Sequence, residues 1–312
     1  MIWSISESRT FKRCQRQWYY KSILANAKAK DPLRHKTYLL GKLQSISSWR
    51  GQTVDTIISD FIIPSMKGTR RRTVFEAKRA ALDLFDRQLA FARKHPLHNP
   101  GFSPTKSGCD CVLLHCMEYA GNISEAEVLQ ARRDVERALE NLFELDQLLA
   151  RFESARSLIT QRAICFSHSG VTVRGVPDLI AFYDELPPLI VDWKVHAYGF
   201  REAWLQLAVY GLALTLCNPH SDFPFALRRW KVTDISFVEA QLLTKQVRQY
   251  TLLPEEVDRA EAYIADSVTQ IVLACDDRSN DQLAPTDFPA ATSPDTCARC
   301  QFRRICWEEN GT

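Results

Sequence analysis

The spacing of apolar residues changes along the chain, and the change occurs near residue 155. Before that point, apolar residues recur at intervals of three and four, which is the period of an amphipathic helix. After it come short stretches rich in β-branched residues with partial alternation, which is the period of a strand. The order of helices, then a strand meander, then mixed helices and strands predicts an α/β core that carries a helical insertion at 65–155.

Single elements follow from the same periods. Pro254 is followed by two glutamates, which suits the first turn of a helix, where proline needs no N–H partner and acids are favoured. Residues 95–110 and 276–296 are polar and contain proline, which predicts loops. The predicted helices lie in the first 25 residues, after Gly51, at 74–94, at 124–150, at about 200–217 and from 254 onward; the predicted strands are 158–167, 171–183, 189–195, 225–238 and 241–252.

The composition is that of a globular protein with a core, since 46% of the residues are hydrophobic and 25% are charged. No apolar run reaches the roughly 18 residues of a membrane helix. The N-terminus lacks the basic segment and apolar core of a signal peptide. We therefore expect a cytoplasmic protein with no membrane association.

Charge is unevenly distributed, although the net charge is only +3. Residues 1–36 hold nine Lys or Arg against two acids, and a second basic run follows at 67–72. Such clusters either neutralise nucleic-acid phosphates or form a solvated basic face, and charge alone leaves both interpretations open. Candidate phosphate contacts are Arg9, Arg13 and Arg16.

Two carboxylates and a lysine fall at hairpin distance in the middle of the chain. The stretch Gly175-Val176-Pro177-Asp178 is expected within one strand, and Asp192-Trp193-Lys194 ends the next. Adjacent carboxylates attract a hard cation such as Mg²⁺ or Mn²⁺. Lys194 projects on the same strand face as Asp192, where it can act on an attacking water or on phosphate charge. Asp-x-Lys alone is common as surface charge, so the position at the end of an apolar strand carries this interpretation.

These residues resemble the RecB-like branch of the PD-(D/E)XK nuclease superfamily, which is marked by Gly-x-x-Asp, Asp-x-Lys and a helical Gln-x-x-x-Tyr. The third element matches Gln206 and Tyr210, which share a helical face. The resemblance implies that Asp178, Asp192 and the backbone carbonyl of Trp193 hold the metal. It also implies that Gln206 and Tyr210 position the lysine or the substrate strand.

The chain departs from this branch at the motif where Gly is followed four residues later by His. After Gly51 the matching position holds Asp55. Aspartate also ligates Mg²⁺ or Mn²⁺ and is a harder ligand than imidazole. We expect Asp55 to complete the metal shell. The alternative is a catalytically inactive nuclease fold retained as a DNA-binding or assembly module.

Ten cysteines are many for a cytoplasmic chain, in which disulfides are disfavoured. Four thiolates at Cys14, Cys297, Cys300 and Cys306 suit either zinc or an iron–sulfur cluster, and the spacing does not decide. The set is similar to that of AddB-type and CRISPR-associated RecB-like exonucleases, one cysteine upstream and three downstream. That resemblance implies a [4Fe–4S] cluster that joins the chain ends. A zinc-stabilised nuclease is the alternative.

The resemblance implies a PD-(D/E)XK restriction-endonuclease-like core, with a central mixed sheet flanked by helices. It implies a metal-dependent deoxyribonuclease, exonuclease more than endonuclease, that acts on single-stranded DNA or DNA ends in recombination, repair or defence against foreign DNA. Because the chain has no Walker-A motif, a helicase or another subunit has to supply any unwinding. One RecB-like domain is expected over 1–312: N-terminal helices at 1–64, the insertion at 65–155, the catalytic core at 156–275 and a cluster-binding tail at 276–312.

Overall fold

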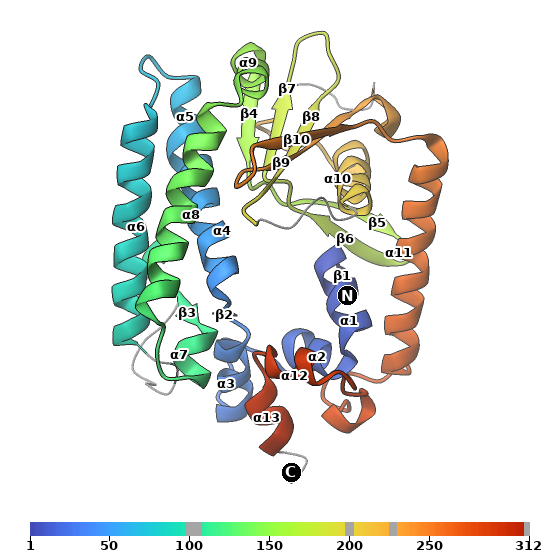
Figure 1. Cartoon of the computed structure of the whole chain (residues 1–312). Coiled ribbons are helices and arrows are strands. Elements are labelled where there is room, and N and C mark those ends of the chain that lie inside the picture. The colour runs from blue at the N-terminus through green and yellow to red at the C-terminus, as the bar shows by residue number, and fades with distance from the viewer. Residues whose placement is uncertain (96, 98–107, 197–202, 225–229, 309–312) are drawn as a thin grey trace.

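The computed structural model describes residues 1–95, 97, 108–196, 203–224 and 230–308 (Figure 1). Two π-helical turns, Tyr20–Leu24 and Ile58–Ile62, directly follow the helices that end at Tyr19 and at Ile57. The helices are α1 (Ile5–Arg13), α2 (Gln15–Tyr19), α3 (Pro32–Leu40), α4 (Ile46–Ile57), α5 (Ile63–Met66), α6 (Val74–Lys94), α7 (His115–Tyr119), α8 (Glu125–Phe143), α9 (Asp146–Ser154), α10 (Trp204–Leu216), α11 (Pro254–Cys275), α12 (Pro294–Ala298) and α13 (Arg303–Glu308). The strands are β1 (Ile2–Trp3), β2 (Leu43–Gln44), β3 (Leu113–Leu114), β4 (Ser157–Thr160), β5 (Ile164–His168), β6 (Val171–Gly175), β7 (Leu179–Phe182), β8 (Leu189–Lys194), β9 (Ser236–Gln241) and β10 (Gln246–Tyr250).

A five-stranded sheet in the order β10-β9-β8-β7-β4 forms the centre of the fold. Strands β8 and β9 are parallel, and the other neighbours in this sheet are antiparallel. A smaller sheet has the order β1-β6-β5, so the first strand of the chain pairs with a strand from its middle. The predicted mixed sheet flanked by helices is therefore confirmed.

Each face of the central sheet packs against its own hydrophobic core. Along β8, Ile190 faces one core, and its neighbours Leu189 and Val191 face the other, as the two-residue period of a strand requires. The first core includes α10 and α11, and the second includes α4, α6 and α8, which stand together to one side of the sheet in Figure 1. Strand β8 is buried on both faces, and it is the strand that ends in Asp192 and Lys194.

Two predicted strands are each divided in the structure. The strand predicted at 158–167 breaks into β4 and β5, with Gln161 in the left-handed region at φ 49°. The strand predicted at 171–183 breaks into β6 and β7 at residues 176–178. Proline at 177 cannot donate to a sheet ladder, which accounts for the second break. The expectation that Gly175 to Asp178 lie within one strand is wrong: Gly175 ends β6, and Asp178 directly precedes β7.

Helix boundaries differ where a side chain caps a new helix. The helix predicted at 74–94 has those bounds in the structure, with a capping box at Thr73 and Glu76. The first 25 residues are not one helix, because Cys14 is extended and its sulfur accepts the N–H of Gln17 to begin α2. The stretch 124–150 divides into α8 and α9, and the strand predicted from 225 begins at 236, with 225–229 outside the described residues. Most of the predicted loop 95–110 and the start of the helix predicted from 200 also lie outside them.

In the part of the chain that the structure describes, no helix has both the length and the apolar character needed to cross a membrane.

Candidate active site and cysteine cavity

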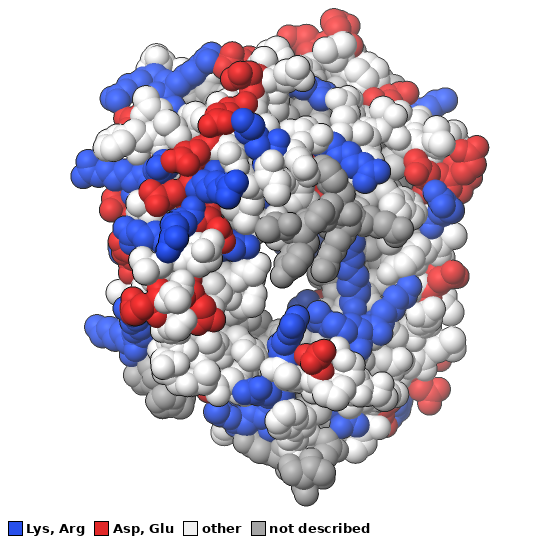
Figure 2. Space-filling view, in the orientation of Figure 1, with Lys and Arg blue, Asp and Glu red and all other residues white. Residues whose placement is uncertain are grey.

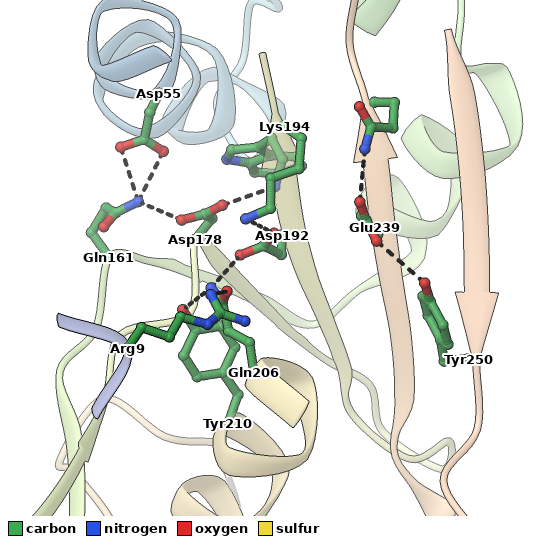
Figure 3. Close-up of polar contacts among 12 residues, drawn as sticks. Arg9, Asp55, Gln161, Asp178, Asp192, Lys194, Gln206, Tyr210, Glu239 and Tyr250 are labelled. Carbon is green, nitrogen blue, oxygen red and sulfur yellow. Dashed lines mark hydrogen bonds and ion pairs between the residues drawn. The ribbon is translucent and has the colours of Figure 1, made fainter. Parts of the chain in front are cut away.

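Side chains from α4, the turn after β4, the start of β7, β8 and α10 meet at one end of the central sheet (Figure 3). Leu179 of β7 is the partner of Val191 of β8, so the next residues outward, Asp178 and Asp192, stand at the same end of that strand pair. Helix α4 brings Asp55 to the same place from the helical side. The converging side chains are Asp55, Gln161, Asp178, Asp192, Lys194, Gln206 and Tyr210.

Gln161 joins two of the carboxylates. Its Nε2 donates to both oxygens of Asp55, at 2.8 and 3.0 Å, and lies 3.3 Å from Oδ1 of Asp178. The other oxygen of Asp178 accepts the backbone N–H of Trp193 at 2.8 Å. The left-handed turn at Gln161 therefore aims its amide between the two carboxylates. Sequence periodicity missed this residue, because it counted Gln161 as part of an uninterrupted strand.

The third carboxylate, Asp192, lies on the opposite side of the site. It is 2% exposed, its Oδ2 forms an ion pair with Lys194, and its Oδ1 accepts a hydrogen bond from Nε2 of Gln206 at 3.0 Å. The same amide nitrogen is 2.7 Å from the Tyr210 hydroxyl, and Oε1 of Gln206 accepts Nη1 of Arg9 at 3.4 Å. The structure thus brings the Asp-x-Lys and Gln-x-x-x-Tyr residues into one network.

The protonation equilibria reflect crowding of negative charge. Burial raises the pKa of Asp55 to about 6, and hydrogen bonding to Gln161 offsets part of that increase. Burial and the neighbouring charges of Asp192 and Asp55 raise the pKa of Asp178 well above its usual range. Burial opposes the charged form of Lys194, but Asp192 and Asp178 outweigh it and raise the lysine pKa. Lys194 is therefore held as a cation.

This donor set fits a hard divalent cation. Burial and the charges of Asp192 and Asp55 raise the pKa of Asp178, so its charged form gains stability from added positive charge, and oxygen is the ligand that Mg²⁺ and Mn²⁺ prefer. In the described part of the chain, no three or more His, Cys, Asp or Glu side chains are already gathered as a set of metal ligands. Gln161 and Lys194 instead hold the carboxylates in place.

A glycine explains why the helix carrying Gln206 comes so close to the sheet. A Cβ at Gly175 would lie 3.0 Å from Cδ1 of Tyr210 and 3.5 Å from Cβ of Ala213. Only a residue without a side chain lets α10 pack this closely on β6. In the Gly-x-x-Asp motif, Gly175 thus allows the close packing of α10, and Asp178 supplies a carboxylate to the site.

A fourth buried acid stands beside the site on β9. Glu239 is 1% exposed and is the strand partner of Asp192. Its two oxygens accept Nε2 of Gln241 at 2.8 Å and the Tyr250 hydroxyl at 3.2 Å (Figure 3). Sequence analysis did not single it out, because it lies in an unremarkable stretch and only the pairing of β8 with β9 places it there.

The four predicted cluster cysteines line one small cavity near the chain ends, with Tyr20, Phe302 and Trp307. Cys14 Sγ accepts backbone N–H groups from Gln17 at 3.4 Å and Ala291 at 3.3 Å. Burial and the neighbouring thiols of Cys14, Cys306 and Cys297 together raise the pKa of Cys300 to about 11, and the backbone N–H of Phe302 offsets part of that rise. The four thiols therefore face one space, which is lined by residues from both ends of the chain.

The three arginines predicted to contact phosphate have different surroundings. Arg9 reaches Gln206, as described above. Arg13 donates to Oε1 of Gln17 on the neighbouring turn. Arg16 Nε donates to the carbonyls of Pro285 and Phe288, at 3.1 and 3.0 Å, and its guanidinium partly offsets the rise that burial causes in the pKa of Cys306. Arg16 therefore fastens α2 to the C-terminal loop.

Comparison with known proteins assigns these features to a family. The sequence matches the PD-(D/E)XK nuclease superfamily over residues 2–307. No curated protein matches the chain. Among solved structures, SSO0001 is 12% identical with a TM-score of 0.31, over 73% of this chain and 96% of its own. A proposed exonuclease from Eubacterium rectale is 10% identical with a TM-score of 0.35, over 89% of this chain and 92% of its own.

Proposed function

The chain belongs to the PD-(D/E)XK nuclease superfamily, and from this membership we propose that it is a metal-dependent DNA nuclease of the RecB-like branch, one domain over its whole length. The observation that carries the proposal is the convergence of Asp55, Asp178 and Asp192 beside a charged Lys194. Three carboxylates and a lysine at the end of a buried strand suit phosphodiester hydrolysis.

Each residue then has a distinct task. Asp55, Asp178, Asp192 and the Trp193 carbonyl would hold Mg²⁺ or Mn²⁺, and the bound metal would supply Lewis-acid activation of water and of the phosphate. Lys194, held as a cation by Asp192, stabilises negative charge that grows on the phosphate oxygens. Gln206, tied to Asp192, Tyr210 and Arg9, orients this end of the site.

The first experiment compares cleavage of end-labelled linear and covalently closed single-stranded DNA in Mg²⁺ and in Mn²⁺. We expect the wild type to cut the linear substrate, as an exonuclease acting on ends does, and Lys194→Ala to be slower by about 10²- to 10⁴-fold. Lys245→Ala is the matched control, because Lys245 is a surface lysine paired with Glu144. Cleavage of the closed circle would instead assign endonuclease activity.

The second candidate function is an inactive nuclease fold that binds DNA or assembles with another protein. The substitution of aspartate for the usual histidine at Asp55 favours it. DNA binding without cleavage in either metal, by a protein whose metal content has been verified, would support this candidate and refute the nuclease.

We further propose that Cys14, Cys297, Cys300 and Cys306 hold a [4Fe–4S] cluster. Their shared cavity and the N–H donors to Cys14 and Cys300 support this, because such bonds stabilise cluster sulfur ligands. Anaerobically purified protein is expected to be brown and to contain iron and acid-labile sulfide. Zinc without sulfide in a colourless protein would assign a structural zinc site instead.

The biological setting that suits these features is recombination, repair or defence against foreign DNA, with single strands or DNA ends as substrate. A helicase or another subunit then supplies the opened strand. Co-purification of the tagged chain with an ATP-dependent helicase from its own cells tests this, and recovery of the chain without any such partner argues against it.

A further inference from the structure

A groove leads away from the candidate active site along the first helix. It has a volume of about 890 Å³, and its walls include Gln206 and Tyr210 of α10. Other walls come from α1, the turn after α2, the end of β6 and the C-terminal end of α11. The groove is therefore continuous with the residues that hold Asp192.

Positive charge predominates in this groove. Four of its lining side chains are cationic (Arg9, Lys21, Arg174 and Arg278) and two are acidic (Glu7 and Asp277). Figure 2 shows Lys and Arg side chains gathered beside the hollow at the centre of this face, where α1 and β6 lie in Figure 1. A cationic groove attracts an anionic polymer and steers it to the site.

Two of these cations remain available for a ligand. Lys21 pairs with Glu7 at 2.8 Å, and Arg278 pairs with Asp287 at 3.0 Å. Among the described residues, Arg9 and Arg174 form no ion pair, although Arg9 donates to Gln206. Arg174 is exposed on β6, next to the Gly175 that packs on Tyr210.

We propose that this groove binds the sugar–phosphate backbone of the strand that is cut, with Arg174 and Arg9 as phosphate contacts. Hydroxyl groups of Ser4, Ser6 and Ser22 also line the groove and suit phosphate oxygens. The inference rests on the proposed nuclease function for the identity of the ligand. Arg174 is the decisive residue, because it lies outside every sequence motif of the catalytic residues.

The test measures binding separately from cleavage. A fluorescent single-stranded oligonucleotide is titrated with Lys194→Ala protein in Ca²⁺, at several salt concentrations between about 50 and 200 mM. Arg174→Ala, Arg174→Lys and Arg9→Ala are compared in this background. Arg133→Ala is the matched control, because Arg133 is an exposed arginine on α8 that forms no ion pair among the described residues.

Loss of one phosphate contact lowers the slope of log affinity against log salt by about 0.7, which corresponds to about fourfold weaker binding at 0.15 M salt. We expect the lower slope and the weaker binding for Arg174→Ala and for Arg9→Ala, each compared with the Lys194→Ala parent. Arg174→Lys should bind nearly as well as this parent, and Arg133→Ala should bind as well as it does. If Arg174→Ala leaves both the salt slope and the affinity for the oligonucleotide unchanged, the proposal that this groove binds the strand is wrong. It is also wrong if the wild-type protein binds no oligonucleotide.

Failure of the proposed function is visible separately. If the wild-type protein cuts no DNA but Arg174→Ala still weakens binding, the groove is supported as the DNA-binding site and the proposed hydrolytic activity is refuted. If the wild type cuts DNA and Arg174→Ala binds and cuts DNA as well as the wild type does, the nuclease activity is supported. The substrate strand then binds outside this groove.

Discussion

The carboxylates of the candidate active site depend on hydrogen bonds that no motif describes. Gln161 donates to Asp55 and Asp178, and Gln206 donates to Asp192. Each amide holds a negative charge that burial alone would disfavour. Asp55 is the residue for which this matters most, because burial raises its pKa to about 6 and the hydrogen bond from Gln161 counteracts that rise.

Replacing Asp55 tests whether it binds metal. Loss of an outer-shell partner typically weakens metal binding by roughly 10- to 100-fold. Because Asp55 is proposed as a direct ligand, we expect Asp55→Asn to need a metal concentration higher by at least this factor for cleavage. Asp55→His is expected to remain active and to shift preference from Mg²⁺ towards Mn²⁺, because imidazole is a softer ligand. Cleavage rates across a titration of each metal provide the measurement. Equal metal dependence for Asp55→Asn and the wild type would exclude Asp55 as a ligand.

At the scale of elements, close packing of α10 against the sheet decides where Gln206 and Tyr210 point. Gly175 of β6 allows α10 to lie close to the smaller sheet, and Gly211 of α10 allows it to lie close to β9 of the central sheet. A Cβ at Gly211 would lie 2.8 Å from both Phe237 Cζ and Val232 Cγ1. The helix is positioned by residues with no side chain as much as by its apolar ones.

Gly211→Ala is therefore expected to reduce the free energy of unfolding by about 1–3 kcal/mol, as overpacking of a core does. Gly51→Ala is the control, because nothing lies within 4 Å of a Cβ there. That change should stabilise α4 by roughly 0.5–1 kcal/mol. Urea denaturation measures both. A neutral Gly211→Ala would mean that Phe237 and Val232 move aside without cost.

Helix α8 fixes the ends of the two parallel strands. Arg50 on α4 forms an ion pair with Asp134 of α8 and donates Nη2 to the carbonyl of Val195 at 2.7 Å, one residue past Lys194. Asn141 of α8 donates to the carbonyl of Leu242, which follows β9, at 2.6 Å. Helices α4 and α8 thus hold the end of β8, which carries Lys194, in place.

If this support matters, Arg50→Lys should lower kcat and leave KM unchanged, because the lysine ammonium cannot reach both partners. A displacement of about 1 Å at a reacting group can cost up to roughly 10²-fold in rate. Arg132→Lys is the control, since Arg132 of α8 pairs with Asp86 of α6 and not with a strand end. Steady-state kinetics separate the two constants, and equal kinetics for both variants would contradict the support.

Across the whole molecule, the two chain ends are joined by packing as well as by the cysteine cavity. Strand β1 pairs with β6, and Trp3 Nε1 donates to Ser267 at 3.0 Å. The ring of Tyr19 stacks on Phe288 with centroids 5.2 Å apart, and Tyr20 meets Phe302 at 5.7 Å. These aromatic contacts bury large apolar surfaces and do not depend on a cofactor.

Removing one thiol should therefore loosen the ends without unfolding the protein. We expect Cys297→Ser to lose iron and to melt at a lower temperature, by roughly 2–4 °C for each kcal/mol lost. Its unfolding should remain cooperative. Cys109→Ser, at an exposed cysteine, is the control. An unchanged melting temperature and iron content for Cys297→Ser would refute the cluster at this cavity.

Local sequence was sufficient for the elements whose signals are local. The bounds of α6 and the start of α11 follow from periodicity, a capping box and a proline followed by acids. The sequence also singled out Asp178, Asp192 and Lys194 as candidate site residues, because Asp192 and Lys194 end an apolar strand and Asp178 precedes them at hairpin distance. Family membership rests on the match over residues 2–307.

Only the tertiary structure decided the rest. The position of the Gln161 amide between Asp55 and Asp178, the pairing of Glu239 with Asp192 and the reach of Arg50 to Val195 arise from contacts between distant parts of the chain. Periodicity reports which face of an element is apolar, but it contains no information on which strand or helix will lie opposite. The physical reason is that strand register and helix packing depend on the whole core, so residues without a motif acquire a position only when the chain has folded.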